Sequence, residues 1–597
     1  MRKVIINNRD YSSWSLMDVN TNIQLSSSLD SQENGNIIIQ NKWFHQDVID
    51  ETNNIMHSTI RTIPYISGVL ILEGNKTYGR TANRKRLLYK CIPDNKRIPH
   101  FLIPFEISIG FKKIHKNKYV IFKFQEWNEF QQHPIGILVE TIGNVDILEC
   151  FYEYQLYSKS LHESIKNITN ITKEFTNKKP IEDYIKQIQY NPKYQIQNRL
   201  ENTAPIFTID PPNSVDFDDG FSIKENVVGL EGETPSLLLT KGFITSTVVT
   251  VYLANVYFWL ETFELWESFS NRVSTIYLPD KRRPMLPTIL SESLCSLQEG
   301  QTRFAFAIDF TIIQENGIVF IDETKTKMQN VIIRPHKNYV YEDPKMLYQD
   351  IHYNKLFQVS SCIDNTIKNS HDLVSFWMIL TNKYIAEYMM KQQKGIFRVG
   401  KQLSSFKGND EQLFHLKDET QRVIKSWNNV VGQYINYNNQ EDTQFEHTLL
   451  NIKSYMHITS PIRRLVDLLN QIMLIGILCP ESISNNAINF IDKWCCRMDY
   501  INLTMSNIRK VQTDCSNLQM CIKTPDIMTE IHQGIVFDKS ENSVSGIYEY
   551  MVYLENIKLL SRIKSTVSVE NFSHNKFKIF LFETEDNSKK KIRVGFA

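Results

Sequence analysis

The stretch Ala204-Pro-Ile-Phe-Thr-Ile-Asp-Pro-Pro-Asn-Ser-Val-Asp-Phe-Asp-Asp-Gly220 is unusually acidic, and no Lys or Arg lies between Arg199 and Lys224. Its four carboxylates fall within ten residues, at Asp210, Asp216, Asp218 and Asp219. Crowded aspartates without a local cation raise one another's pKa, so keeping them ionised requires a bound metal ion or full exposure to water. Carboxylate oxygens without nearby Cys or His favour Mg²⁺, with Mn²⁺ as an alternative, over Zn²⁺.

The flanking residues predict that this acidic stretch is a loop held between two strands. Ile206, Phe207 and Ile209 are typical of a buried strand, and the apolar alternation resumes at Phe221 and Ile223. A solvated turn loop is the alternative interpretation for aspartates of this kind. A helix-loop-helix calcium site fits poorly, because it would place Val215 at the first ligand position.

The segment from Thr208 to Gly220 closely resembles the signature of the ribonuclease II (RNB) family, which includes bacterial ribonucleases II and R and the catalytic exonuclease of the eukaryotic exosome. A second block, Arg272 to Leu297 followed by Arg303-Phe-Ala-Phe-Ala, resembles the same family. The resemblance implies an α+β multidomain protein, with an RNB catalytic domain flanked by N-terminal cold-shock-like OB barrels and a C-terminal S1-like OB barrel.

Local composition, the pattern of apolar residues and this resemblance together predict five regions along the chain. They are an N-terminal extension (1–60), a first cold-shock-like region (61–97), a second cold-shock-like barrel (98–180), the RNB catalytic domain (181–525) and the S1-like OB barrel (526–597). The first region is rich in Ser, Asn and Gln without strong periodicity, so we expect a partly ordered arm.

Basic and aromatic residues alternate in the second predicted barrel. The set is Lys112, Lys113, Lys116, Lys118, Tyr119, Phe122, Lys123, Phe124 and Trp127. Such a mixture suits single-stranded nucleic acid, because cations follow phosphates and rings stack on bases. A solvated barrel face with aromatic residues in its core is an equally good interpretation of the spacing alone.

A third block, Tyr455 to Asn470, predicts a helix that begins with Ser460 as N-cap and Pro461 as first residue. Arg463 and Arg464 would then lie in the first turn, where the helix dipole disfavours cations unless an anion such as a phosphate binds there. Asp467 lies four residues after Arg463 and is a candidate partner for its guanidinium. Two surface arginines paired locally is the alternative.

The resemblance also implies roles for individual residues. Asp219 and Arg463 are the expected catalytic residues, and Asp210, Asp216, Asp218 and Asp219 the expected metal ligands. We expect Ser460 and Arg464 to contact substrate, and Tyr341 to stack on the terminal nucleotide, although a core aromatic is the rival interpretation of Tyr341.

The chain departs from the family pattern at several positions. Where the family has His-Ile-Ala-Asp-Val, this chain reads Tyr252-Leu-Ala-Asn-Val256, and Ser375 and Phe376 occupy the places of paired glutamates. A glutamate expected after the arginine block is replaced, with Gln512 as the nearest match. These changes bear on substrate anchoring and rate more than on metal binding.

The composition is compatible with this reading. The 597 residues are 42% hydrophobic and carry a formal net charge of +1, which argues only against a uniformly basic binder. Nine cysteines without paired C-x-x-C spacing indicate reduced thiols in an intracellular protein, cytoplasmic or nuclear. The apolar run Ile472 to Cys479 is too short to span a membrane.

The sequence is therefore compatible with two alternative functions. The first is a magnesium-dependent 3′-to-5′ exoribonuclease that hydrolyses single-stranded RNA to nucleoside 5′-monophosphates, alone or with protein partners of an RNA-decay complex. The second is an RNB-fold scaffold that binds RNA with little or no turnover, which the changes at Asn255, Ser375 and Phe376 would favour.

Overall fold

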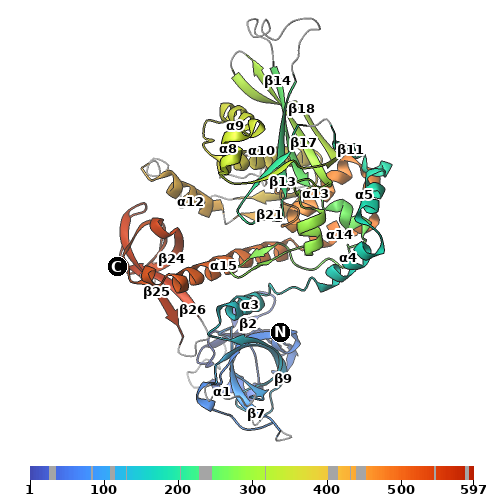
Figure 1. The fold of residues 1–597 in the computed structure, drawn as a ribbon. Helices are drawn as coiled ribbons and strands as arrows, with labels where there is room; N and C mark the ends of the chain where they lie inside the picture. The colour runs from blue at the N-terminus through green and yellow to red at the C-terminus, as the bar shows by residue number, and fades with distance from the viewer. Residues whose placement is uncertain are drawn as a thin grey trace, which may run out of the picture. The chain divides into compact units, whose positions relative to one another are not determined.

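The computed structural model contains two compact units (Figure 1). Unit 1 comprises Met1–His162, Leu278–Lys281 and Asn507–Ala597, and unit 2 comprises Glu163–Tyr277 and Arg282–Ser506. The structure describes every residue except 26–34, 82–84, 108–114, 130, 202–203, 227–244, 316–317, 401–414, 430–431, 438–444, 446–451, 543–545 and 585–589.

Unit 1 begins with a five-stranded sheet in the order β3-β2-β1-β4-β5. Its elements are β1 (Arg2–Ile6), β2 (Trp14–Asp18), β3 (Gln24–Leu25), α1 (Gly35–Asn41), β4 (Val48–Ile49), β5 (Ile55–His57) and α2 (Thr59–Thr62). Val4 and Ile6 alternate with less buried residues along β1 and join a core with Leu16 and Trp43. The prediction of a partly ordered arm over residues 1–60 is therefore wrong for the described residues, because a short apolar alternation suffices to build a sheet despite the polar composition.

A closed barrel follows, with the strand order β10-β8-β7-β6-β9. Its elements are β6 (Ile66–Leu70), η1 (Glu73–Asn75), β7 (Leu87–Pro93), β8 (Phe101–Phe105), β9 (Lys118–Glu126), β10 (Ile135–Asn144) and the following helix α3 (Leu148–Ser158). Because β6 pairs with β9 along Ile66–Leu70, strands from both sides of residue 97 belong to one barrel. The predicted division into regions 61–97 and 98–180 is therefore wrong.

The aromatic residues of this barrel mostly fill its core. Tyr119 and Phe122 are fully buried, and Trp127 is nearly so. The interpretation of these three rings as a base-stacking surface is wrong, because their faces already pack against other core side chains. Lys112 and Lys113 lie outside the described residues.

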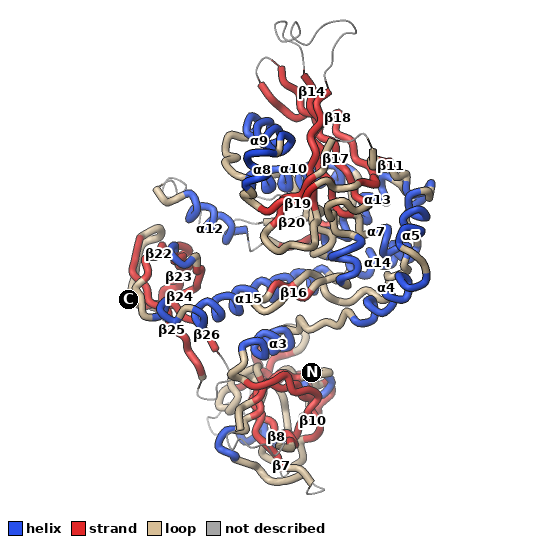
Figure 2. The backbone as a smooth tube through the Cα atoms, viewed as in Figure 1, coloured by secondary structure: helices blue, strands red, loops and turns tan. Residues whose placement is uncertain are grey.

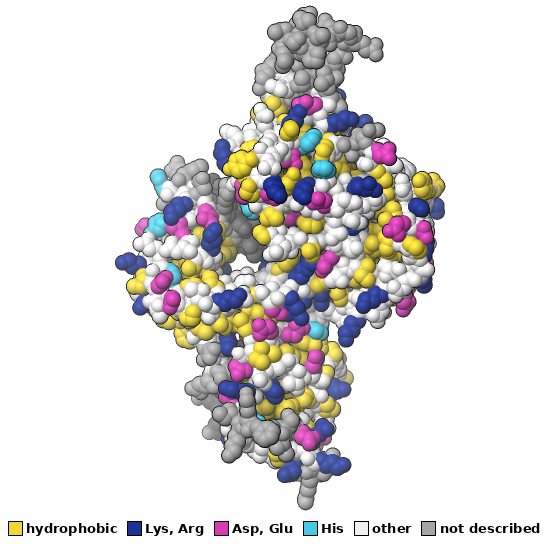
Figure 3. Space-filling model, viewed as in Figure 1, with side chains coloured by type: hydrophobic (Ala, Val, Ile, Leu, Met, Phe, Trp, Pro, Cys, Tyr) yellow, Lys and Arg dark blue, Asp and Glu magenta, His cyan; other side chains and the backbone are white. Residues whose placement is uncertain are grey.

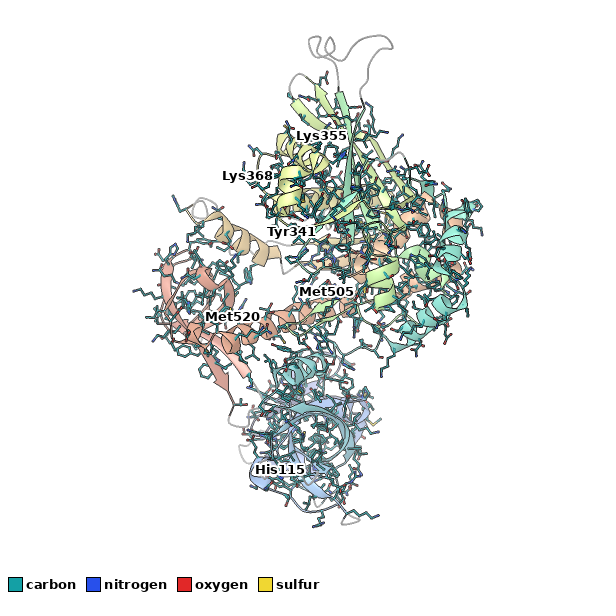
Figure 4. All side chains as sticks on the ribbon, viewed as in Figure 1. His115, Tyr341, Lys355, Lys368, Met505 and Met520 are labelled. Atoms are coloured by element: carbon teal, nitrogen blue, oxygen red, sulfur yellow. The ribbon has the colours of Figure 1, made fainter. Side chains whose placement is uncertain are left out.

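Unit 1 ends with a second five-stranded antiparallel sheet, in the order β24-β23-β22-β25-β26. Helix α15 (Met498–Lys523) begins in unit 2 and ends in unit 1, where Met520 packs against the core of this sheet (Figure 4). The remaining elements are η7 (Pro525–Met528), β22 (His532–Asn542), β23 (Ile547–Leu554), η8 (Glu555–Ile557), β24 (Leu559–Ser565), β25 (His574–Glu583) and β26 (Lys590–Phe596). These five strands lie within residues 526–597, for which the sequence predicts an S1-like OB barrel.

Unit 2 is built on a seven-stranded sheet in the order β11-β18-β17-β14-β13-β12-β19. The strands are β11 (Gln197–Asn198), β12 (Phe207–Asp210), β13 (Asp219–Asn226), β14 (Thr245–Ala254), β17 (Arg303–Glu315), β18 (Ile318–Ile333) and β19 (Lys337–Val340). Small two-stranded sheets pair β15 (Ile276–Tyr277) with β16 (Arg282–Arg283), and β20 (Ile396–Val399) with β21 (Gln433–Asn436).

Helices surround this sheet, and Figure 2 shows α8, α9 and α10 along one side of it. The helical elements are α4 (Lys166–Lys178), α5 (Ile181–Gln189), η2 (Pro192–Tyr194), α7 (Tyr257–Thr262), η3 (Ile289–Leu294), α8 (Pro344–Gln349), α9 (Ile351–Ile363), α10 (Ser370–Lys391), α12 (Asp418–Asn429), α13 (Leu465–Leu478), η6 (Pro480–Ser482) and α14 (Asn485–Cys495). The buried Trp377 of α10 packs on Phe310 of β17, with ring centroids 5.7 Å apart, and donates to Ser360 of α9. This contact fixes α10 to the sheet.

No helix among the described residues is long and apolar enough to cross a membrane. On the face seen in Figure 3, Lys and Arg side chains are scattered among acidic ones, as a net charge near zero implies. On this face, a surface that binds nucleic acid would therefore be a local one.

Candidate active site

The four aspartates lie where the sequence predicts them, on a loop between two antiparallel strands. Asp210 is the last residue of β12 and Asp219 the first of β13, which pair through Phe207 and Phe221. The loop begins with a turn closed by the Ser214 N–H and the Pro211 carbonyl, 3.2 Å apart.

Hydrogen bonds to neighbouring segments hold the loop in place. Phe217 donates its N–H to Ser296 Oγ at 3.0 Å, and this hydroxyl donates to the Val215 carbonyl at 2.7 Å. The Asp218 carbonyl accepts from the Ala254 N–H at 2.7 Å. Because Ser296 comes from the second sequence block and Ala254 from the altered Tyr252–Val256 segment, the acids are positioned by residues far away in the sequence.

The buried Asp219 and the partly buried Asp210 form a pair of carboxylates close enough to interact. Burial and the charge of Asp210, opposed by Arg463 and Arg464, raise the pKa of Asp219 to about 7. Burial likewise raises the pKa of Asp210. One oxygen of Asp210, Oδ2, is buried without a hydrogen-bond partner among the described residues. Two desolvated carboxylates with an unpaired oxygen are stabilised by a shared cation, so the pair fits a divalent metal ion.

The other two aspartates are already paired with arginines. Asp216 Oδ1 lies 2.6 Å from Arg282 Nη1, and Arg282 also contacts Glu292. Asp218 is fully enclosed, and its Oδ1 accepts from the Ile462 N–H at 2.9 Å while Oδ2 lies 3.0 Å from Arg463 Nε. Burial, opposed by Arg463, raises the pKa of Asp218.

Consequently the described part of the chain contains no ready-made group of three His, Cys, Asp or Glu side chains around a metal position. The expectation that Asp210, Asp216, Asp218 and Asp219 act as one ligand set remains a prediction. In this conformation Asp210 and Asp219 are the two of the four that no arginine engages in an ion pair among the described residues.

The arginine block has a different local structure from the predicted one. Pro461 to Arg463 form a turn, and α13 begins at Leu465 with Arg464 as N-cap. Arg464 is extended there because its neighbours bond to another segment: the Leu465 N–H donates to Val273 and the Thr275 N–H to Arg463. The predicted helix start at Ser460 and Pro461 is therefore wrong by four residues.

The pairing of the two arginines also differs from the prediction. Arg464 Nη2, not Arg463, binds Asp467 Oδ1 at 2.8 Å, and the same oxygen accepts from the Ser460 N–H. Arg463 instead contacts Asp218 and donates from Nη2 to Ser460 Oγ at 2.9 Å. The Arg463 side chain is 46% exposed, so it combines a fixed position beside the acids with access from outside.

Tyr341, labelled in Figure 4, follows directly after β19 and precedes α8. Its N–H donates to the Asp210 carbonyl at 3.1 Å, and burial together with the charges of Asp219 and Asp210 raises the pKa of its hydroxyl. One face of its ring stacks on His371, with centroids 3.7 Å apart and an interplanar angle of 11°. The partly buried ring is therefore held next to the acids, and a core position is excluded.

Glu342, the residue after Tyr341, bonds to Ser370 at the start of α10. Glu342 has a left-handed backbone (φ 58°) and donates its N–H to Ser370 Oγ, while its carboxylate accepts from both the N–H and the hydroxyl of Ser370 at 2.8 and 2.6 Å. The sequence interpretation missed Glu342, Ser370 and His371. The Asn369-Ser-His-Asp run was an available signal, because Asn369 caps α10 by accepting from the Asp372 N–H.

The residues that depart from the family pattern have separate surroundings. Asn255 is fully buried, with its amide 3.4 Å from Asn330 Oδ1. Ser375 and Phe376 lie on α10 and line a cavity of about 430 Å³. Gln512 lies on the part of α15 that belongs to unit 1.

The seven-stranded sheet and its acidic loop define one structural unit, and comparison with known proteins specifies the family to which it is similar. The RNB domain model matches residues 197–356 and 345–479, and the Dis3-like cold-shock domain 2 (CSD2) model matches residues 88–152. The CSD2 match crosses residue 97, in agreement with the single barrel of β6 to β10. The chain belongs to the ribonuclease II (RNB) family.

Relatives and solved structures agree with this assignment. The DIS3-like exonuclease 2 of Schizosaccharomyces pombe is 27% identical over 236 residues, which cover 38% of this chain and 22% of that protein. The chain is also similar to Mycoplasma genitalium RNase R in complex with ribose-methylated single-stranded RNA (TM-score 0.64, 15% identity, 100% of this chain and 96% of that chain). It is similar as well to yeast Ssd1, a pseudonuclease (TM-score 0.57, 14% identity, 94% and 78%). At these identities the two structures show the fold alone.

Proposed function

We propose that the chain is a metal-dependent exoribonuclease that degrades single-stranded RNA from the 3′ end and releases nucleoside 5′-monophosphates. The observation that carries the proposal is the pair of Asp210 and the buried Asp219, which has a carboxylate oxygen without a hydrogen-bond partner among the described residues and lies beside the half-exposed Arg463. A purely structural loop would gain nothing from keeping two desolvated carboxylates together.

Asp210 and Asp219 would hold Mg²⁺, or Mn²⁺ in its place, with Asp216 and Asp218 as further ligands once they exchange their arginine partners. When bound, such an ion activates water and stabilises the departing 3′ oxygen. Divalent-metal dependence is general among RNB-family nucleases.

Arg463 would stabilise the negative charge that builds up on the phosphate during hydrolysis. Its contacts with Asp218 and Ser460 use Nε and one hydrogen of Nη2, so further N–H groups remain for phosphate oxygens. Because Asp218 and Ser460 hold it before substrate arrives, little reorganisation is needed in the transition state. Arg464 is tied to Asp467 and would act by holding this turn.

Tyr341 would fix the 3′ end by stacking on the terminal base through the ring face that His371 leaves open. The RNA would be bound in part by unit 1. The nine free cysteines fit an intracellular site of action, cytoplasmic or nuclear.

An RNA-binding scaffold without turnover is the second candidate. It is favoured by the loss of acidic side chains at Ser375 and Phe376 and by the likeness of the fold to a pseudonuclease.

Incubation with 5′-labelled single-stranded RNA, with Mg²⁺, with Mn²⁺ and with EDTA, distinguishes the two. The exoribonuclease shortens the RNA stepwise only with metal, spares a 3′-phosphorylated RNA and yields 5′-monophosphates from a uniformly labelled strand. Asp219→Asn should abolish hydrolysis while RNA affinity survives or rises, because a negative charge is lost near the phosphate. Asp322→Asn, which changes a partly buried aspartate of β18 that bonds to Thr324 and Lys325, is the matched control and should retain activity. Undiminished turnover of Asp219→Asn would remove this residue from the mechanism.

A further inference from the structure

One arginine bridges Asp216 of the acidic loop and a carboxylate outside the loop. Arg282 Nη1 lies 2.6 Å from Asp216 Oδ1, and Arg282 Nη2 lies 2.5 Å from Glu292 Oε1. The side chains of Arg282 and Asp216 are only 24% and 11% exposed, so their contact is mostly shielded from water. Contacts between two charged groups in such a setting are stronger than neutral hydrogen bonds. We call this arrangement of three side chains the Arg282 bridge.

Separate elements hold the members of the bridge. Arg282 is on β16 and Glu292 is on η3. The backbone before and after Asp216 bonds to the hydroxyl of the buried Ser296, which accepts from the following N–H and donates to the preceding carbonyl. The loop is therefore fixed on both sides of Asp216, and its carboxylate can change partner by a rotation of the side chain alone.

Asp218 is held more firmly than Asp216. Its side chain is 3% exposed, one carboxylate oxygen accepts from the Ile462 N–H, and the other lies 3.0 Å from Arg463 Nε. Releasing Asp218 would leave a buried N–H group without its acceptor, which is costly. If Asp216 were released instead, the Arg282 guanidinium would still have Glu292 as a partner. Asp216 is therefore the easier of the two aspartates to free for another cation.

Asp216 also lies close enough to the other acids to share a cation with them. Burial, to which the charge of Asp216 adds, raises the pKa of Asp210 and of Asp218. When ionised, Asp210 and Asp219 carry two negative charges, which one divalent ion balances. A second divalent ion requires further carboxylate oxygens, and Asp216 can supply them once Arg282 releases it.

We propose that the Arg282 bridge controls how many metal ions the site holds. While the bridge is intact, Asp210 and Asp219 bind one divalent ion, and a second ion binds only when Asp216 turns away from Arg282. Glu292 keeps the released guanidinium paired, so the exchange avoids the cost of an unpaired, mostly buried cation. The first ion then binds tightly and the second weakly. The inference rests on the proposed metal-dependent function, and it makes Arg282 a positioning residue that acts through Asp216.

The test counts the Mn²⁺ ions that the full chain binds without RNA, using the electron paramagnetic resonance signal of free Mn²⁺ during a titration. The wild type should bind one ion tightly and a second ion with a dissociation constant larger by a factor on the order of 10 or more. Arg282→Met frees Asp216 and removes a positive charge beside it. This variant should therefore reduce the ratio of the two dissociation constants by a factor on the order of 10.

Three further variants make the result specific. Glu292→Gln should weaken the second site, because Arg282 loses the carboxylate that keeps it paired after release of Asp216; this variant decides the question if Arg282→Met does not fold. Asp216→Asn should remove the second ion and retain the first. Arg334→Met, which removes an exposed guanidinium of unit 2 that bonds to Thr302, is the matched control for the lost charge and should keep the wild-type ratio.

An unchanged ratio in folded Arg282→Met overturns the role of the bridge, and so does an equal change in Arg334→Met or a stronger second site in Glu292→Gln. RNA hydrolysis by the same proteins, assayed separately, distinguishes this result from the proposed function. If the ratio shifts as expected while the wild type hydrolyses no RNA, the bridge stands and the nuclease function falls. If the wild type hydrolyses RNA only with metal while the variants bind Mn²⁺ like the wild type, the nuclease function stands and the bridge falls. A wild type that binds no Mn²⁺ overturns both.

Discussion

Replacing Asp219 by Asn should make the metal-free catalytic unit more stable at pH 8, although it removes the residue expected to be most important for catalysis. Burial raises the pKa of Asp219 from 3.8 to about 7 in the folded chain. The unfolded chain releases this proton near pH 4 and the folded chain near pH 7, so stability falls as the pH rises between these values. Above pH 7 the cost is roughly 4 kcal/mol, at about 1.4 kcal/mol for each pKa unit. An amide left without a partner costs about 1–3 kcal/mol, so the net gain should be about 1–3 kcal/mol.

Urea unfolding in EDTA, followed by the fluorescence of the buried Trp259, Trp377 and Trp494 of unit 2, measures this gain. Most of it should disappear at pH 5, where the wild-type carboxyl is protonated, and Mg²⁺ should favour the wild type again. Asp216→Asn is the control, since loss of its ion pair with Arg282 should destabilise the protein. The reasoning is refuted if Asp219→Asn is no more stable than the wild type at pH 8, or if the gain is equal at pH 5.

Three other predictions concern activity. Arg463→Ala should lower kcat by a factor on the order of 100 with little change in RNA affinity, because its contact strengthens in the transition state; a loss of affinity with unchanged kcat would assign Arg463 to RNA positioning. Tyr341→Ala should stop digestion at a longer end product, as stacking worth about 1–3 kcal/mol is lost near the acids; gel analysis showing identical end products would exclude the stacking role. Because Ser375 and Phe376 replace acidic side chains, one deoxynucleotide near the 3′ end should slow digestion only moderately, and a complete block there would contradict this.

The acidic loop could be predicted because its signals are local. Buried strand residues, Pro211 and the four aspartates lie within seventeen positions, so the ends of β12 and β13 follow from alternation and composition. The family resemblance added the expectation of flanking barrels. Unit 1 contains the closed barrel of β6 to β10 and the five-stranded sheet of β22 to β26, in agreement with this expectation.

What the sequence did not reveal depends on pairing between distant segments. Nothing near Arg463 indicates that Asp218 will be its partner, and the nearer Asp467 was a reasonable but wrong choice. The start of α13 is displaced because Val273 and Thr275 bond to the turn before it. The predicted boundary between two barrels at residue 97 is wrong for the same reason, because the pairing of β6 with β9 cannot be inferred from the sequence of either strand alone.

The parallel pairing of β12 with β19 fixes the position of Tyr341 along the chain relative to Asp210. It sets Asp210 opposite Val340, one residue before Tyr341, and neighbouring strands are about 4.8 Å apart. If the Tyr341 ring stops the RNA end, this register sets how far that end lies from the acids, whatever the length of the strand. Inserting one residue in the segment 336–340 would turn the ring to the other side of the sheet. The distance between the RNA end and the acids is then a property of backbone register and not of any single side chain.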